Sequence, residues 1–230
     1  MDRDESAAEL PVLDLTGPVR VPCSSMPDSR KIAFIGSHSV RKTNAVHSFA
    51  GAVGRKGRSV EVGREVVRYS PLGLNEGASP EAQLWVIMAQ IQQELELRNR
   101  ADVLVTDRAV IDNFAYFLRT TNGDDPFDVK PLIRRWSATY DLYVRLKPDV
   151  PLQVDGVRST SERFRNEIES ILDMIVPQFV DPDLVMELPA SEINESFDWQ
   201  MLLDRLFGIE DADSGRVERP VSYAPRLFDD

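Results

Sequence analysis

The segment at residues 32–43 carries a glycine, a lysine and a threonine at a fixed spacing. It reads IAFIGSHSVRKT, and Gly36, Lys42 and Thr43 match the pattern G-x-x-x-x-G-K-[ST] in type and position. In that pattern, backbone N–H groups and the start of a helix surround phosphate oxygens. The lysine neutralises the β and γ phosphates, and the threonine hydroxyl binds Mg²⁺. The sequence therefore predicts a phosphate-binding loop made of Gly36, Ser37, His38, Ser39, Val40, Arg41, Lys42 and Thr43.

Arg41 departs from this pattern, which has glycine at the same place. Glycine lets the backbone approach a phosphate closely because it has no Cβ. An arginine there either crowds the phosphate or adds a cation to the site, and the sequence leaves both open. Cations at a helix start oppose the helix dipole, so Arg41 and Lys42 together favour a bound anion over a chance strand–turn–helix.

An acidic and a basic residue end another apolar segment, VLVTDR at 103–108. Phosphate-loop proteins place a magnesium-associated carboxylate at the end of a buried strand. Asp107 is therefore a candidate metal ligand together with Thr43. Arg108 could hold a phosphoryl group through two hydrogen bonds. The alternative is an ordinary surface ion pair.

Glu65 and Arg68 follow a short segment predicted as a strand and stand three residues apart. One helical turn would put both on the same face. Glu65 is a candidate general base toward an acceptor hydroxyl, with Arg68 as a second acceptor-binding residue. A helical ion pair is the competing interpretation.

Three arginines surround the predicted start of a later helix, in DGVRSTSERFR at 155–165. Arg158, Arg163 and Arg165 would repel one another unless an anion or carboxylates intervene. In a phosphate-transferring enzyme they would belong to a lid, at about residues 150–166, that closes over the phosphates. A solvated basic face is the alternative.

Short apolar runs alternate with amphipathic patterns through the centre of the chain. The runs predict strands at 31–35, 59–62, 103–106, 140–146 and 184–188. Helical patterns occupy 42–53, 80–98, 110–119, 131–136, 161–176 and 194–207. In the helix at 80–98 we expect Ser79 as the N-cap and one apolar face made of Leu84, Ile87, Met88, Ile91 and Leu95. The alternation predicts a five-stranded parallel sheet with helices on both faces and ligands at the carboxyl ends of its strands.

The composition is that of a globular protein with an acidic surface. The 230 residues carry a formal net charge of −11, so broad nucleic-acid binding is unfavourable unless basic residues gather in one cleft. Cys23 is the only cysteine, which excludes a disulfide framework and predicts a cytoplasmic protein. No apolar run approaches the roughly 20 residues of a membrane helix, so no membrane partner is expected.

One domain with two appendages is expected from the length and the composition. Residues 1–29 and 209–230 carry scattered Pro, Ser and Asp without a period, which predicts a flexible amino-terminal arm and a carboxyl-terminal tail. The predicted domain spans residues 30–208.

Four segments together resemble a known family: the loop at 36–43, REVVR at 64–68, VTDRAVIDNFAY at 105–116 and DGVR at 155–158. They are similar to the AAA-type P-loop kinase-like family that includes the nicotinamide-riboside kinase domain, with small bacterial and phage members. The resemblance covers roughly residues 31–190. It implies a three-layer α/β P-loop NTPase fold, ATP and Mg²⁺ as cofactors, and a nucleoside, nucleotide or related hydroxyl compound as acceptor. It also implies the loop roles for Lys42 and Thr43, the strand-end acid for Asp107 and the lid for Arg158, Arg163 and Arg165.

These patterns favour an ATP-dependent kinase in which Lys42, Asp107, Glu65 and Arg108 carry the transfer. Such a reaction needs mainly positioning and charge stabilisation. The acceptor would be a nucleoside or nucleotide, or a modified DNA base if a basic cleft overcomes the acidic surface. Arg41 keeps a second hypothesis open, a regulatory switch that binds nucleotide with weak or no phosphotransfer. A structural subunit that has lost nucleotide binding is disfavoured because the chain keeps Lys42, Thr43 and Asp107.

Overall fold

A parallel sheet runs through the described part of the chain and sets the position of every site residue. The structure, a computed structural model, describes residues 29–73, 77–152, 161–194 and 196–208. The strands are β1 Arg30–Ile35, β2 Val60–Gly63, β3 Val103–Asp107, β4 Leu142–Lys147 and β5 Val185–Pro189. They lie in the order β2-β3-β1-β4-β5, and every neighbouring pair is parallel. The predicted arm before Ser29 and the predicted tail at 209–230 lie outside the described residues.

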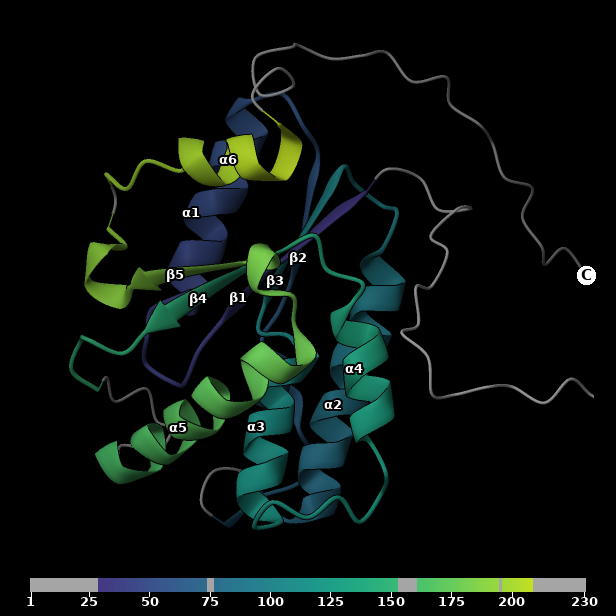
Figure 1. The fold of residues 1–230 in the computed structure, drawn as a ribbon. Coiled ribbons are helices and arrows are strands. Elements are labelled where there is room, and N and C mark those ends of the chain that lie inside the picture. The colour runs from purple at the N-terminus through teal and green to yellow at the C-terminus, as the bar shows by residue number, and fades with distance from the viewer. Residues whose placement is uncertain (1–28, 74–76, 153–160, 195, 209–230) are drawn as a thin grey trace, which may run out of the picture.

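Helices cover both faces of this sheet (Figure 1). On one face lie α1 Lys42–Arg55 and α6 Gln200–Phe207, and on the other lie α2 Pro80–Leu97, α3 Val110–Thr120, α4 Lys130–Ser137 and α5 Glu162–Phe179. The 3-10 turns are η1 Val66–Tyr69, η3 Pro182–Leu184 and η4 Ala190–Glu192. The parallel sheet is thus the middle one of three layers, which confirms the predicted P-loop NTPase fold.

The central strand β1 is buried on both faces, which explains its continuous apolar run. Because side chains alternate along a strand, Ile32 and Phe34 enter the core under α1 and α6. Ala33 and Ile35 enter the core under α2 to α5. The chain therefore leaves β1 at Gly36 from the middle of the sheet, between the ends of β3 and β4.

The buried face of α2 differs from the prediction. Ile87 is buried as expected, but Met88 and Leu95 are 41% and 55% exposed, whereas Gln90 and Glu94 are buried. The apolar pattern was misleading because this helix packs a polar network against the sheet. Glu94 Oε2 accepts a hydrogen bond from Lys31 Nζ at 2.8 Å, and a buried charge of this kind requires such a partner.

Element boundaries agree with the prediction to within about three residues, except at the last helix. Ser79 caps α2 as expected, since its hydroxyl accepts the Ala82 N–H at 3.2 Å. The start of α6 is at Gln200 rather than at 194. There the Asp198 carboxylate accepts the Gln200 N–H at 3.0 Å, and the buried Trp199 ring packs against the core before the helix begins.

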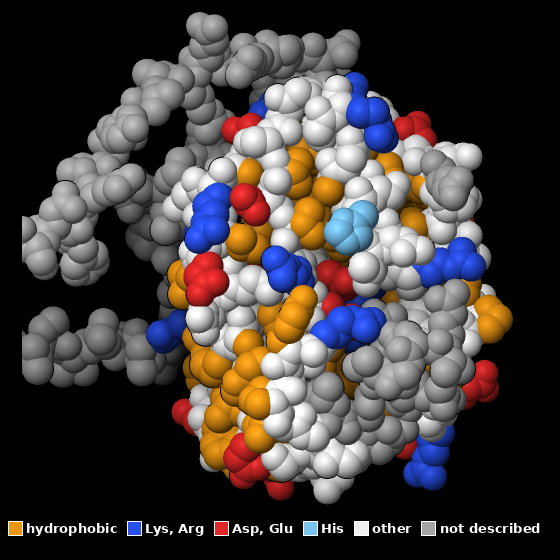
Figure 2. All heavy atoms as spheres, turned by 180° about the vertical axis from the view of Figure 1, so that it is seen from behind, with side chains coloured by type: hydrophobic (Ala, Val, Ile, Leu, Met, Phe, Trp, Pro, Cys, Tyr) orange, Lys and Arg blue, Asp and Glu red, His pale blue; other side chains and the backbone are white. Residues whose placement is uncertain are grey.

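One face of the molecule, drawn in Figure 2, has basic and acidic side chains interspersed with apolar groups. That face therefore offers no broad basic surface of the kind that tracks a nucleic-acid backbone. Within the described residues, no helix has the length and apolarity needed to cross a bilayer.

Candidate functional site

The segment between β1 and α1 wraps around the side chain of Lys42. Gly36 has φ 139°, and a Cβ there would lie 2.5 Å from the Leu146 carbonyl oxygen, so only glycine fits. Lys42 is buried at the start of α1. Its Nζ returns to the loop and donates to the Gly36 carbonyl at 2.8 Å and to the Ser37 carbonyl. The loop thus surrounds a buried ammonium group.

The environment of Lys42 disfavours its charge. Burial, and secondly the nearby Arg108 guanidinium, lower the pKa of the Lys42 ammonium to about 8. The carboxylates of Asp112, Asp107 and Glu65 oppose that shift. A buried cation next to another cation is costly unless an anion joins them. The site is therefore built to receive negative charge.

Arg41 occupies a conformation that glycine adopts without cost. Its φ of 59° and ψ of 23° lie in the left-handed region, at the N-cap position of α1. An L-residue there costs about 1–2 kcal/mol. The Arg41 Nη1 donates to the Ile193 carbonyl at 3.4 Å, so the guanidinium reaches the turn that follows β5. The loop keeps this left-handed residue although the motif glycine is missing.

Thr43 and Asp107 meet directly behind the loop. The Thr43 hydroxyl donates to Asp107 Oδ2 at 2.5 Å, while Asp107 Oδ1 is buried and has no hydrogen-bond partner in the described part of the chain. A hydroxyl and a carboxylate are the hard oxygen donors that Mg²⁺ prefers. The described residues contain no group of three or more His, Cys, Asp or Glu suited to a metal. A magnesium ion on this pair would therefore take its remaining ligands from water and phosphate.

Arg108 directly follows β3, and its guanidinium is held by Glu65, which lies just after β2. Its Nε pairs with Glu65 Oε1 at 3.1 Å, and Glu65 Oε2 pairs with Arg68 Nε at 2.8 Å. Burial alone would lower the pKa of Arg108, but Tyr116 and the surrounding carboxylates hold it above its ordinary value. The guanidinium is therefore charged, and its buried Nη1 has no hydrogen-bond partner among the described residues.

Orphaned polar atoms gather at the loop. Within the described residues, the buried oxygens Ser37 Oγ, Ser39 Oγ and Asp107 Oδ1 and the nitrogen Arg108 Nη1 have no hydrogen-bond partner. Native proteins satisfy nearly all such groups, so a cluster of exceptions indicates a missing polar ligand. Donors from hydroxyls and a guanidinium suit phosphate oxygens, and a free carboxylate oxygen suits a metal ion. The residues present therefore fit a nucleotide phosphate chain with Mg²⁺.

The sequence of this region matches a known family. The family described as "AAA domain" matches residues 31–182, which spans the loop, Glu65, Asp107, Arg108 and nearly all of the crossover between β4 and β5. The chain belongs to this AAA-domain family.

Among solved structures, this AAA domain resembles thymidylate kinase from Ehrlichia chaffeensis. The two chains are 17% identical, the match covers 75% of this chain and 91% of the other, and the TM-score is 0.49. At this level of similarity the resemblance carries no argument about substrate. A search of curated proteins returned no match.

Of the three predicted lid arginines, the structure describes Arg163 and Arg165, and both donate to groups outside the loop. Arg158 lies outside the described residues. Arg163 is exposed and its Nε donates to Glu167 at 2.9 Å. Arg165 is buried, and its Nη1 donates to the Val150 carbonyl at 2.8 Å. Their role as a lid stays a prediction.

The sequence reading missed two carboxylates that hold the loop. The Gly36 N–H donates to Asp112 Oδ1 and the Ser37 N–H to Glu169 Oε1, both at 2.8 Å. Asp112 also accepts the Ala109 N–H at 2.9 Å, so an acid at the N3 position of α3 was the signal available for it. Glu169 had no local signal, because its partner lies 132 residues away.

His38 lies within the loop and packs against two helices. It is buried, its Nδ1 lies 3.4 Å from the Tyr116 hydroxyl, and its ring centroid lies 5.5 Å from that of Phe164. These contacts fix the loop against α3 and α5. The Val40 side chain is buried in the core, so the hydroxyls of Ser37 and Ser39 are the loop side-chain groups that could contact a ligand.

One groove lies away from this chemistry. A space of about 1670 Å³ opens between α3, α4 and α5, lined by Phe114, Phe179 and Arg163 among others. None of the residues at 36–43 borders it. The loop, where the orphaned polar atoms lie, is the better candidate site.

Proposed function

We propose that this AAA domain is an ATP- and Mg²⁺-dependent kinase that transfers the γ-phosphoryl group to a hydroxyl of a nucleoside, a nucleotide or a related compound. The observation that carries the proposal is the buried Asp107 Oδ1, which has no hydrogen-bond partner among the described residues, beside the Thr43 hydroxyl. A phosphate loop alone supports nucleotide binding. Transfer also needs a carboxylate and a cation at the neighbouring strand end, and Asp107 and Arg108 have that position.

Each residue of the site has a role in this proposal. The backbone of residues 36–43 and the Lys42 ammonium bind the phosphates, and the buried Arg108 guanidinium stabilises charge on the group in transfer. Mg²⁺, when bound by Thr43 and Asp107, would neutralise the phosphate oxygens. Arg158, Arg163 and Arg165 remain the proposed lid, with the transfer complete only when it closes.

Asp107 is a better partner for the acceptor hydroxyl than Glu65. Both oxygens of Glu65 contact guanidinium groups, those of Arg108 and Arg68, so accepting a further proton would break an ion pair. Asp107 keeps one oxygen without a partner in the part of the chain that the structure describes. We therefore propose that Asp107 orients the acceptor or the metal, directly or through water. Glu65 would hold Arg108 in place, and with Arg68 it would border the acceptor.

The acceptor is proposed to be a free small molecule. The resemblance to the group that includes the nicotinamide-riboside kinase domain supports a nucleoside-like compound. The net charge of −11 and the interspersed charges in Figure 2 disfavour a DNA acceptor, so a modified DNA base is the less favoured substrate. The proposal also includes a cytoplasmic location, a single domain at 30–208 with two appendages, and no membrane partner.

A phosphotransfer screen tests this proposal. Labelled ATP with Mg²⁺ would be incubated with nucleosides, including nicotinamide riboside, with nucleotides and with short DNA. We expect transfer to a nucleoside-like compound, and a loss of at least about 100-fold in kcat for Asp107→Asn with ATP binding retained. Glu65→Gln, the matched control, should raise KM for the acceptor more than it lowers kcat. Bound ATP without transfer to any acceptor would contradict the kinase proposal.

A regulatory switch that binds nucleotide but transfers slowly or not at all is the second candidate. The observation that favours it is Arg41 in a left-handed conformation, where the motif has glycine. Arg41→Gly separates the two. If the arginine impairs a kinase, the glycine variant should bind ATP more tightly and turn over faster. If activity falls, Arg41 is part of the working site.

A further inference from the structure

One peptide group of the loop connects Lys42 to α5. The peptide between Gly36 and Ser37 carries the Gly36 carbonyl on one side and the Ser37 N–H on the other, since trans peptides point these groups in opposite directions. The Ser37 N–H donates to Glu169 Oε1 at 2.8 Å. The Gly36 carbonyl accepts from Lys42 Nζ at 2.8 Å. Holding the N–H toward Glu169 therefore aims the carbonyl at the lysine.

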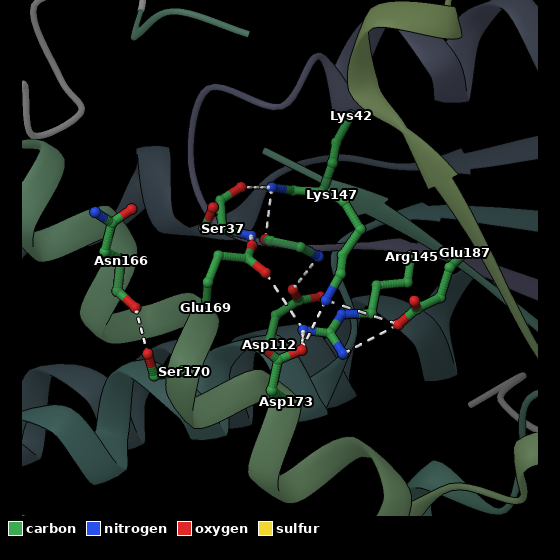
Figure 3. A network of polar contacts seen from close by, with 11 residues as sticks. Ser37, Lys42, Asp112, Arg145, Lys147, Asn166, Glu169, Ser170, Asp173 and Glu187 are labelled. Atoms are coloured by element: carbon green, nitrogen blue, oxygen red, sulfur yellow. Dashed lines mark hydrogen bonds and ion pairs between the residues drawn. The ribbon is translucent and has the colours of Figure 1, made fainter. Parts of the chain in front are cut away.

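Glu169 is itself held by a buried arginine. Its Oε2 accepts from Arg145 Nη2 at 3.3 Å, and both side chains are at least nine-tenths buried. Arg145 also reaches Asp173 at 2.8 Å and Glu187 at 3.3 Å. Those two carboxylates are more than half exposed, and Lys147 pairs with them as well. Figure 3 shows this network between α5, the last strands and the loop.

The Arg145–Glu169 pair is buried, whereas the neighbouring carboxylates of Asp173 and Glu187 are more than half exposed. Surface ion pairs contribute little, because water screens them. A buried carboxylate and guanidinium strongly constrain each other, since either one alone would be an uncompensated charge. The Arg145–Glu169 pair therefore fixes the carboxylate oxygen that accepts the Ser37 N–H, while Asp173 and Glu187 can be changed at small cost.

We propose that Glu169, held by Arg145, is a positioning residue of the phosphate loop. It fixes the 36–37 peptide and so places the carbonyl that positions the Lys42 ammonium. A negatively charged side chain would repel phosphate, so Glu169 acts through the loop backbone and does not contact the ligand. This inference rests on the proposed function, because its consequence is the affinity for the nucleotide phosphates.

Glu169 is a cleaner test than the other carboxylate on the loop. Asp112 holds the Gly36 N–H but also caps α3 through the Ala109 N–H, so its removal would disturb a helix start as well. Glu169 lies within α5, where alanine is a good helix former. Asp173, one turn further along α5, contacts Arg145 but not the loop in the described part of the chain, and it provides a matched control.

The experiment compares Glu169→Ala, Glu169→Gln and Asp173→Asn in the full chain with two measurements. The first is hydrogen exchange of the Ser37 amide by NMR without nucleotide. We expect exchange about tenfold or more faster in Glu169→Ala, near wild type in Glu169→Gln, which keeps an acceptor oxygen, and unchanged in Asp173→Asn. The second is the Kd for ATP. We expect it about tenfold weaker in Glu169→Ala, within about threefold in Glu169→Gln, and within about twofold in Asp173→Asn.

Each outcome bears on a different statement. Ser37 exchange that is unchanged in Glu169→Ala would overturn the contact. Faster exchange with an unchanged Kd, or equal losses in all three variants, would leave Glu169 as a packing residue and overturn the positioning role. If wild type binds no ATP, the proposed function fails, while the exchange measurement still decides the contact. If Glu169→Ala does not fold, Glu169→Asp, whose shorter side chain withdraws the acceptor, replaces it in both measurements.

Discussion

Two buried lysines lie at opposite ends of the central strand, and their surroundings differ completely. Lys31 lies near the amino end of β1, and Lys42 follows the loop at its carboxyl end. Both are almost fully buried, and burial lowers the pKa of both. What distinguishes them is the set of groups that faces each ammonium.

Lys31 has a complete set of partners. Its Nζ pairs with Glu94 at 2.8 Å and donates to the Thr139 hydroxyl at 2.5 Å. The ammonium also lies 3.8 Å from the centroid of the Tyr140 ring, a favourable cation–π arrangement. Glu94 in turn accepts from Trp136 Nε1 at 2.7 Å. This is a closed structural network.

In the described part of the chain, Lys42 Nζ donates to two backbone carbonyls, with a second cation nearby and orphaned polar atoms around the loop. The same residue type, equally buried, therefore has a carboxylate partner in one place and carbonyl partners beside unsatisfied polar atoms in the other. The comparison indicates that the completeness of the partners, more than burial or a shifted pKa, distinguishes a structural charge from a candidate binding group.

The largest effect on stability is expected at Lys31. Lys31→Met leaves Glu94 buried without its cation, and we expect the free energy of unfolding to fall by about 3–5 kcal/mol. Urea denaturation of the variant measures this. Replacing both partners in Lys31→Met/Glu94→Met should recover part of the loss, since it removes the uncompensated charge. A single variant as stable as wild type would break the comparison.

Lys42 should show the opposite behaviour. In Lys42→Met we expect ATP affinity to fall at least about 100-fold, roughly 3 kcal/mol. At pH 7 the free energy of unfolding should not fall, because the variant removes a buried ammonium whose charge costs stability. Calorimetric titration and urea denaturation of the same sample check both. ATP binding that survives the change would sink the phosphate-loop assignment.

The lowered pKa of Lys42 gives a signed pH dependence. In the folded state the pKa is about 8, below the ordinary value of 10.5, so the unfolded chain binds more protons between these two values. Stability contributed by this site therefore rises with pH from about 8 to about 10.5, by at most about 3 kcal/mol. Below pH 8 the full cost of the buried charge is present.

The difference between wild type and Lys42→Met isolates this contribution. Lys31, Tyr140 and Tyr143 also titrate at high pH with shifted pKa values, but they are common to both proteins and cancel. We expect the difference in unfolding free energy to change between pH 8 and 10.5 in favour of wild type. A flat difference across that range would contradict the buried, uncompensated state of Lys42.

The smallest effect concerns the two ends of the loop. Arg41→Gly should relieve the left-handed conformation and stabilise the fold by up to about 1 kcal/mol. Gly36→Ala should instead destabilise the fold by more than this gain, since its Cβ would lie 2.5 Å from the Leu146 carbonyl oxygen. Thermal unfolding of both variants checks the pair. A destabilised Arg41→Gly would mean that the contact with the Ile193 carbonyl outweighs the strain.

The parts of the site that depend on neighbouring residues could be predicted from the sequence. The loop pattern lies within eight residues. Asp107 ends β3 and Thr43 lies just after β1 and the loop, so the parallel pairing of these two strands brings the two side chains together at one edge of the sheet. The polar face of α2 could not be predicted, because its periodicity points to Leu95 and Met88 while the partner of Glu94 is on β1. Glu169 was missed for the same reason, since nothing near position 169 indicates the loop.

The order of the strands also sets a sequence of events in time. β1 precedes the other four strands in sequence, yet it lies between β3 and β4 in the sheet. Its two edges can therefore form their hydrogen bonds only after β3 and β4 have been synthesised. Contacts between residues this distant in sequence slow folding, because the conformational entropy of the long intervening segment is lost before the contact stabilises the fold. The Ser37–Glu169 bond spans 132 residues. A nascent chain that ends before α5 contains β1, β2, β3 and β4 but lacks the carboxylate that accepts the Ser37 N–H, so this hold on the loop forms only after α5 has been made.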